Sequence, residues 1–278
     1  MVRHEPVWRR FRRSPVATAA LAYVVLITLI AILAPLLSPY APDDANLAIR
    51  LRPPDRSHLF GTDDVGRDVL ARMIYGSRVS LLVGFCATAL SALVGSFLGA
   101  IAGYYGRAAD WVVSRLIEIV LCFPFLFLVL GIVALFRPSL VTILMALTLT
   151  SWTTEARFVR SEFLRIRELD YADAARASGA RDARVIFKHL LPNALAPVVV
   201  SSSFGVASAI LTESALSFLG FGVALPTASW GSILGVAHEY IEYAWWLALF
   251  PGIAIFLTVA AFNLIGDRLR DVLDPRGA

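Results

Sequence analysis

The sequence predicts an all-α integral membrane protein with six transmembrane helices. Of its 278 residues, 58% are hydrophobic and only 17% are charged, whereas a soluble domain of this length would be about 45–50% apolar and about 25% charged. Long apolar runs alternate with shorter polar segments, and a helix needs about 20 apolar residues to cross a bilayer. The apolar runs are therefore expected to form one membrane domain rather than two soluble domains.

The distribution of arginine predicts how these helices are oriented. The chain has a formal net charge of +4, and Lys188 is its single lysine. In a membrane protein such a basic excess marks cytoplasmic segments more often than nucleic-acid binding. Residues 1–15 are accordingly expected to form a cytoplasmic N-terminal segment, and binding of lipid headgroups is compatible with the same position. The arginines of this segment are Arg3, Arg9, Arg10, Arg12 and Arg13.

Residues 16–78 are predicted to contain the first transmembrane helix and an extracytoplasmic loop. The first span covers residues 16–37 and is ended by Pro35 and Pro39. Further along, residues 60–76 predict a turn and then a helix capped by Asp64. Its apolar face suits a helix that lies along the membrane surface. A packed loop is the alternative.

Residues 79–266 are predicted to form the core of the membrane domain. The second span, residues 79–102, contains Gly95 and Gly99, a spacing that permits close helix packing. The third span, residues 111–136, contains Arg115 and Glu118 one turn apart. We interpret this pair as local stabilisation rather than as a functional intramembrane charge.

The remaining spans are separated by one basic and one non-basic segment. A short fourth span begins at Pro138, ends at Trp152 and continues as a helix in water to Leu169. The fifth span covers residues 193–213 and the sixth covers residues 244–265, followed by a cytoplasmic tail, residues 267–278.

Residues 214–244 contain no lysine or arginine, as expected of an outside loop. The segment is apolar but broken by glycines, which predicts a re-entrant or gate-like segment shielded by protein. The candidate residues of this outer gate are Glu213, Ser217, Phe218, Gly220, Phe221, Gly222 and Trp230.

Residues 170–192 form a polar island between apolar blocks and predict a cytoplasmic helix–turn–helix. Asp170 is the expected N-cap of the first helix, and Gly179 can end that helix in a left-handed conformation. Asp182 is expected to cap the second helix, which Pro192 limits. The first helix is lined with alanines, so another backbone can approach it closely. An ordinary alanine-rich surface helix remains the alternative.

The sequence contains no recognisable catalytic set. It has no GxxxxGK[ST] phosphate loop and therefore no such means of binding ATP itself. It has no HExxH or CxxC metal motif, and Cys86 and Cys122 lie in apolar runs where they behave as small apolar residues. We expect no directly bound cofactor and no enzymatic activity. Gly205 and residues 201–203 either line a path or serve packing.

Four motifs give the chain a resemblance to a known family. Asp173-Ala-Ala, followed after three residues by Gly179 and ending in Leu191-Pro192, resembles the "EAA" signature of permease subunits of ATP-binding-cassette (ABC) importers, with aspartate in place of glutamate. The stretches at residues 60–70, 213–223 and 263–276 resemble the second permease of dipeptide, oligopeptide and nickel importers. The four motifs occur in order and, with the six spans, cover nearly the whole chain.

The resemblance implies a type I importer permease fold in a prokaryotic inner membrane, with both termini in the cytoplasm. It implies a second homologous permease, two cytoplasmic ATP-binding subunits and an extracytoplasmic solute-binding protein as partners, and no nucleic acid. Residues 170–192 would then be the coupling helix region, which docks on an ATP-binding subunit. Its coupling residues would be Tyr171, Ala172, Asp173, Ala174, Ala175, Ser178, Gly179, Arg181, Leu191 and Pro192.

Peptides are the substrate that we favour, because no histidine cluster accompanies the outer loops. A nickel or other small-solute importer is the alternative within the family. Two other classes of protein remain. A self-sufficient secondary transporter would show inverted repeats and buried ionisable groups at mid-membrane, and a membrane enzyme would show a catalytic constellation within the spans.

Overall fold

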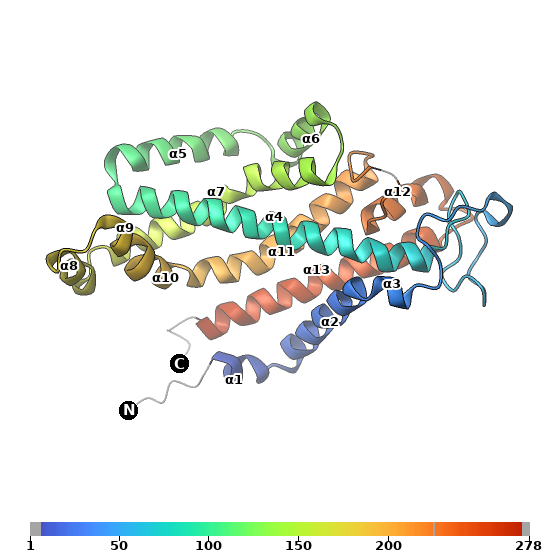
Figure 1. Ribbon diagram of the computed structural model, residues 1–278, viewed down its shortest axis with the longest axis horizontal. Coiled ribbons are helices and arrows are strands. Elements are labelled where there is room, and N and C mark those ends of the chain that lie inside the picture. The colour runs from blue at the N-terminus through green and yellow to red at the C-terminus, as the bar shows by residue number, and fades with distance from the viewer. Residues whose placement is uncertain (1–6, 225, 274–278) are drawn as a thin grey trace.

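The computed structural model describes residues 7–224 and 226–273. Within these ranges the chain forms helices and one isolated β-bridge between Thr62 and Asp68, and no extended strand. The helices lie roughly along one long axis, as Figure 1 shows. The expectations for Arg3 and Arg276 lie outside the described residues.

Six helical segments account for the six predicted spans. Four helices of the described chain are long and apolar enough to cross a membrane: α2 (Pro15–Ile32), α4 (Val69–Tyr105), α11 (Ala196–Phe218) and α13 (Trp246–Leu273). A bent pair, α5 (Arg107–Leu121) and α6 (Phe125–Phe136), provides a fifth. The sixth segment is α7 (Leu140–Ile166), whose second half is polar and extends the fourth span as predicted.

The third span is not the single straight helix that residues 111–136 predict. Its two halves are bent by 87° at a break between Leu121 and Phe125. Pro124 lies in the break and occupies the N-cap position of α6. The pyrrolidine ring disfavours helical geometry in the preceding residue, which explains why α5 ends here. Arg115 and Glu118 form an exposed ion pair on α5, consistent with local stabilisation.

The predicted surface helix at residues 60–76 is wrong in its start and its place. Asp68, not Asp64, caps the helix, and its Oδ1 accepts a 2.7 Å hydrogen bond from the amide of Ala71. The helix is the first part of α4 and is continuous with the second span. Arg72 is only 1% exposed and its Nε lies 3.5 Å from Oδ2 of Asp63. The preceding loop therefore packs onto α4, which buries these turns.

A stripe of glycines brings α4 and α7 into direct backbone contact. An added Cβ at Gly95 would lie 2.5 Å from the Trp152 carbonyl oxygen, and one at Gly99 would lie 2.5 Å from that of Ala156. The close packing predicted from Gly95 and Gly99 is thus confirmed. The stripe extends to Gly103, where an added Cβ would lie 2.4 Å from Cβ of Phe163.

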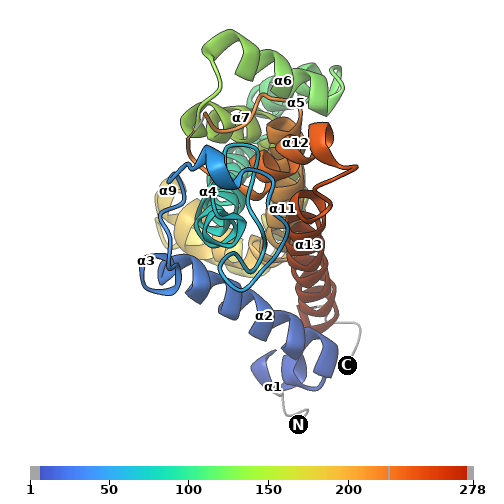
Figure 2. The same ribbon diagram turned by 90° about the vertical axis from the view of Figure 1, so that its right-hand side faces the viewer.

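The two ends of the molecule carry different elements. One end holds α8 (Asp170–Ala177), α9 (Asp182–Arg184), α10 (Leu191–Ala194) and the start of α5, and α1 (Val7–Arg12) lies toward it (Figure 1). The opposite end holds α3 (Ala34–Leu37), the loop that contains η1 (Leu47–Ile49), and α12 (Trp230–Tyr240). Figure 2 looks onto this second end.

We predict that Gly99→Ala weakens the α4–α7 contact, because the new methyl group meets a backbone carbonyl that cannot turn away. The cost is about 1–3 kcal/mol, as for other overpacked cores. Gly131→Ala on α6 is the matched control, since no atom lies within 4 Å of its added Cβ. Thermal unfolding of the purified protein in detergent measures both changes. An unchanged midpoint for Gly99→Ala would contradict the packing argument.

Candidate functional site

The polar island folds as a small helical unit anchored on α7. Ala172 of α8 is fully buried and packs in one cluster with Val159 and Phe163 of α7. Ala175 is half-buried against the same cluster. The exposed face of α8 includes Tyr171, Asp173, Ala174 and Ser178. The alanines therefore divide into an inner pair, Ala172 and Ala175, and outer positions that face away from the protein.

Gly179 ends α8 as predicted, in the left-handed conformation with φ +78°. The amide of Gly179 donates to the Arg176 carbonyl at 2.9 Å, and the amide of Ala180 donates to the Ala175 carbonyl at 3.2 Å. These two bonds form a Schellman motif, which satisfies carbonyls at the helix end.

The predicted side-chain caps of the island are wrong. Leu169 occupies the N-cap position of α8 and Asp170 lies within its first turn, where a negative charge still suits the helix dipole. Asp182 is the first residue of α9 and follows Arg181. Its carboxylate instead accepts a 2.8 Å hydrogen bond from the hydroxyl of Tyr104 at the end of α4.

The second half of the island departs from a simple helix. A π-helical turn, η2 (Val185–Leu190), links α9 to α10, which begins with Leu191 and Pro192. Proline is tolerated in the first turn of a helix because its missing N–H has no partner there. Pro192 therefore starts α10, contrary to the expectation that it limits the second helix of the island.

At the opposite end, Glu213 lies at the centre of a buried polar cluster. It is 0% exposed, and Ser217 Oγ donates to its Oε1 at 2.7 Å while Ser80 Oγ donates to its Oε2 at 3.3 Å. Ser80 Oγ also accepts the amide of Trp230 at 3.3 Å, and Ser217 Oγ lies 3.5 Å from Ser229 Oγ. The cluster joins α4, α11 and α12.

The predicted re-entrant segment is two helices joined by a loop. The helix α11 continues through Ser217 to Phe218, and α12 begins at Trp230. Two backbone hydrogen bonds end α11. The amide of Gly220, which has φ +82°, donates to the Ser217 carbonyl, and the amide of Phe221 donates to the Leu216 carbonyl. An added Cβ at Gly222 would lie 1.9 Å from Ser217 Oγ, so only glycine fits there. The glycines thus serve helix ending and close approach.

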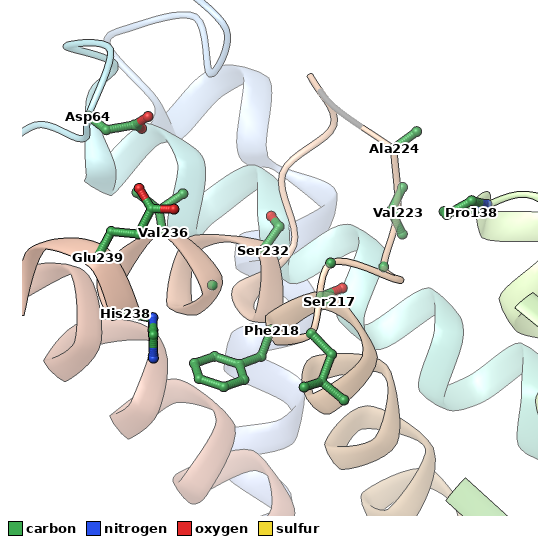
Figure 3. A pocket seen from close by; sticks show the side chains of 14 residues that line it. Asp64, Pro138, Ser217, Phe218, Val223, Ala224, Ser232, Val236, His238 and Glu239 are labelled. Carbon is green, nitrogen blue, oxygen red and sulfur yellow. The ribbon is translucent and has the colours of Figure 1, made fainter. Parts of the chain in front are cut away.

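An open cleft of about 780 Å³ lies beside this loop, and Figure 3 shows its lining. Phe218 and His238 face each other across α11 and α12 with ring centroids 5.8 Å apart. Asp64 and Glu239 add carboxylates to the rim. Burial raises the pKa of the Asp64 carboxyl, with a smaller contribution from the charge of Asp63.

Sequence reasoning places Glu213, Ser217 and Trp230 at the outer mouth, and the structure brings these three together in one region. It missed Ser80 and Ser229, because isolated serines in apolar segments carry no distinguishing pattern. Trp230 is a buried anchor, 1% exposed, whose Nε1 donates to the Met73 carbonyl at 3.1 Å.

Among the described residues no group of three or more histidine, cysteine, aspartate or glutamate side chains is placed to hold a metal ion. The arrangement is that of a multi-pass membrane protein with one polar helical surface at one end and a cleft at the other.

Comparisons with known proteins identify the class. Residues 95–277 match the family of binding-protein-dependent transport system inner membrane components. The chain belongs to this family. Residues 6–54 also match the N-terminal transmembrane domain of oligopeptide transport permease C.

Curated relatives extend this match to nearly full length. The dipeptide transport system permease protein DppC of Alkalihalophilus pseudofirmus is 43% identical, over 97% of this chain and 88% of that protein. The oligopeptide transport system permease protein OppC of Bacillus subtilis is 39% identical, over 96% of this chain and 88% of that protein. The resemblance predicted from the four motifs is confirmed.

A solved structure confirms the fold. A chain of the MetNI methionine ABC transporter, in an inward-facing conformation, superposes with a TM-score of 0.59 at 22% identity. The match covers 73% of this chain and 97% of that chain. The protein therefore has the permease fold of type I ABC importers.

Proposed function

We propose that this chain is the membrane-spanning permease subunit of an ATP-driven importer, and that it forms part of the path for dipeptides or oligopeptides. The observation that carries the proposal is the near full-length identity, 43% and 39%, to permeases named for dipeptide and oligopeptide transport. The chain would lie in the plasma membrane of a prokaryote and receive its substrate from an extracytoplasmic solute-binding protein.

Besides this chain, the importer would need three kinds of partner. A second, homologous permease would complete the path, two cytoplasmic ATP-binding subunits would supply energy, and the solute-binding protein would deliver the peptide. The chain lacks a phosphate loop, so ATP would act through these partners and no cofactor would bind here directly. A self-sufficient secondary transporter is the alternative from another class.

Only some residues of the EAA-like motif lie on the exposed face of α8, where an ATP-binding subunit would bind. Ala172 and Ala175 pack inward, whereas Tyr171, Asp173 and Ala174 are exposed. The small Ala174 side chain would let a partner groove approach the helix backbone. The inner alanines would instead transmit a movement of α8 to α7, because they contact the cluster that includes Phe163.

The outer residues Glu213, Ser217, Phe218, Gly220, Phe221, Gly222 and Trp230 are proposed to shape the outer mouth. Their hydrogen bonds hold the loop between α11 and α12 against α4. The cleft beside the loop is lined by residues of α12, and α12 lies at the end of the molecule opposite α8 (Figure 1). A solute released at this end would meet the cleft first.

The proposed orientation places α8 and both termini in the cytoplasm. It rests on the arginines near α7 and α8 and on the lack of lysine and arginine in residues 214–244. We predict that single cysteines at Arg181 and Thr227, both exposed positions, react with an impermeant thiol reagent from opposite sides. Cys86 and Cys122 are replaced by alanine beforehand. Labelling of both positions from one side would overturn the orientation.

We predict that Ala174→Trp abolishes association with the ATP-binding subunits and leaves the permease folded, because the bulky ring lies on the exposed face of α8. Ala108→Trp is the matched control: it lies at an exposed position at the start of α5, at the same end of the molecule. Co-purification from detergent extracts and thermal unfolding of the permease measure the two effects. Normal association of Ala174→Trp would show that α8 is an ordinary surface helix.

The function itself is tested by uptake in liposomes that contain both permeases and the ATP-binding subunits. With the solute-binding protein outside and ATP inside, we expect accumulation of a labelled dipeptide and no accumulation without ATP. Accumulation of nickel in place of the peptide would favour the alternative substrate. Peptide uptake by this chain alone, driven by an ion gradient, would favour a secondary transporter.

A further inference from the structure

A second cavity lies between the helices and opens onto the surface of the chain, and its lining residues belong neither to α8 nor to the outer cleft. It has a volume of about 480 Å³ and is lined by residues of α4, α7 and α11, and by Leu121 and Phe125 on either side of the bend between α5 and α6. Eight of the lining residues carry hydroxyl groups, among them Thr88, Ser91 and Ser201. Hydroxyl groups inside membrane-spanning helices require a reason, since those without partners are costly in an apolar medium.

Among the described residues that line this cavity, Glu155 is the only charged one. It lies on α7 and is 6% exposed, and Ser201 Oγ on α11 donates to its Oε2 at 2.6 Å. Within the described residues no arginine, lysine or histidine forms an ion pair with this carboxylate, and none lines the cavity. Ionisable side chains inside membrane spans usually pair with another charge or mark a substrate pathway.

Close helix contacts at two glycines shape the wall of this cavity. An added Cβ at Gly95 of α4 would lie 2.6 Å from Cβ of Glu155. The two helices therefore touch at this point, and there is no gap between them that the Glu155 side chain could enter. On the other side, an added Cβ at Gly205 would lie 3.0 Å from Cγ2 of Thr88. These glycines hold α4, α7 and α11 close together and leave the polar side chains to form the cavity wall.

Two hydroxyl groups of the wall also lack a partner. The Thr88 and Ser91 residues are only 9% and 3% exposed. Their hydroxyl oxygens, Thr88 Oγ1 and Ser91 Oγ, are buried and form no hydrogen bond in the structure. Both line the same cavity as Glu155. The wall of the cavity therefore contains one carboxylate, and two buried hydroxyl groups beside it have no partner within the described chain.

We propose that this cavity is a transit site for the transported peptide and that the Glu155 carboxylate binds the peptide's α-ammonium group. An ammonium group carries three donors and no acceptor, which suits a carboxylate beside hydroxyl oxygens. A charge-assisted hydrogen bond of this kind is about twice as strong as a neutral one. The proposal rests on the peptide permease function proposed above.

A nickel ion suits the same cavity poorly. Imidazole nitrogen is a favoured ligand of nickel, and no histidine or cysteine lines this cavity. A single carboxylate with alcohol oxygens is a weak set of ligands for that metal, whereas it is an adequate set for an organic ammonium group.

The test compares Glu155→Gln with wild type in the complete importer, reconstituted in liposomes with its solute-binding protein. The glutamine keeps the size and can still accept a hydrogen bond from Ser201, but it has no charge. We expect at least a tenfold loss of dipeptide uptake at equal protein, with assembly and binding-protein-stimulated ATP hydrolysis within twofold of wild type. Glu155→Asp should restore part of the uptake. Glu162→Gln, seven residues further along α7, is the matched control.

Each outcome decides the matter. Uptake by Glu155→Gln within twofold of wild type would overturn the transit site, and so would parallel loss of assembly and ATP hydrolysis, which indicates a structural role. Failure of the wild-type importer to accumulate any dipeptide would instead overturn the peptide function itself. The two proposals are thus distinguishable.

A second measurement probes the charge of the cavity without transport. In a background free of Cys86 and Cys122, Thr154→Cys places a thiol beside Glu155 in the cavity wall. We expect a cationic methanethiosulfonate to react several-fold faster, relative to a neutral one of similar size, when Glu155 is present than in the Glu155→Gln variant. An equal ratio of rates in both backgrounds would show that the carboxylate offers no charge to a guest, and would overturn the proposal.

Discussion

The contact between α4 and α7 is the constraint on which the rest of the structure depends. Glycines at positions 95, 99 and 103 let the two helix backbones touch. Because α7 is held there, its polar second half presents Val159 and Phe163 to the island and so seats α8. The same contact places Glu155 in the wall of the second cavity. The packing of α4 on α7, the position of α8 and the wall of this cavity therefore all depend on the same glycines.

The sequence predicts the large features of this fold because they follow from long, strong signals. The apolar runs locate the spans, and the spacing of Gly95 and Gly99 predicts the close pair. The positive φ of Gly179 was predictable since a helix that stops after Ser178 needs a residue that tolerates the left-handed region. The family motifs then specify the type I permease fold, which a solved structure supports.

The features that the sequence does not predict depend on contacts between distant segments. Asp68 rather than Asp64 caps α4, because the loop before it folds back and uses Asp63 to bind Arg67 and approach Arg72. The bend at Pro124 is visible as a proline but its angle of 87° is set by tertiary packing. Glu155 belongs to no sequence motif. Its position in a cavity wall becomes visible only in the folded chain, where Thr88 of α4 and Ser201 of α11 line the same cavity.

The length of α4 has a mechanical consequence. Its 37 residues form one helix from the Asp68 cap to Tyr105. Near its end the hydroxyl of Tyr104 donates a hydrogen bond to Asp182, which lies close to α8 in the chain. At a rise of 1.5 Å per residue the rod is about 55 Å long, well beyond the bilayer core. The described helix contains no proline and no break between these two ends. A tilt of α4 by about one degree would displace one end by roughly 1 Å relative to the other, so a movement at one end of the molecule would reach the opposite end with the opposite sign.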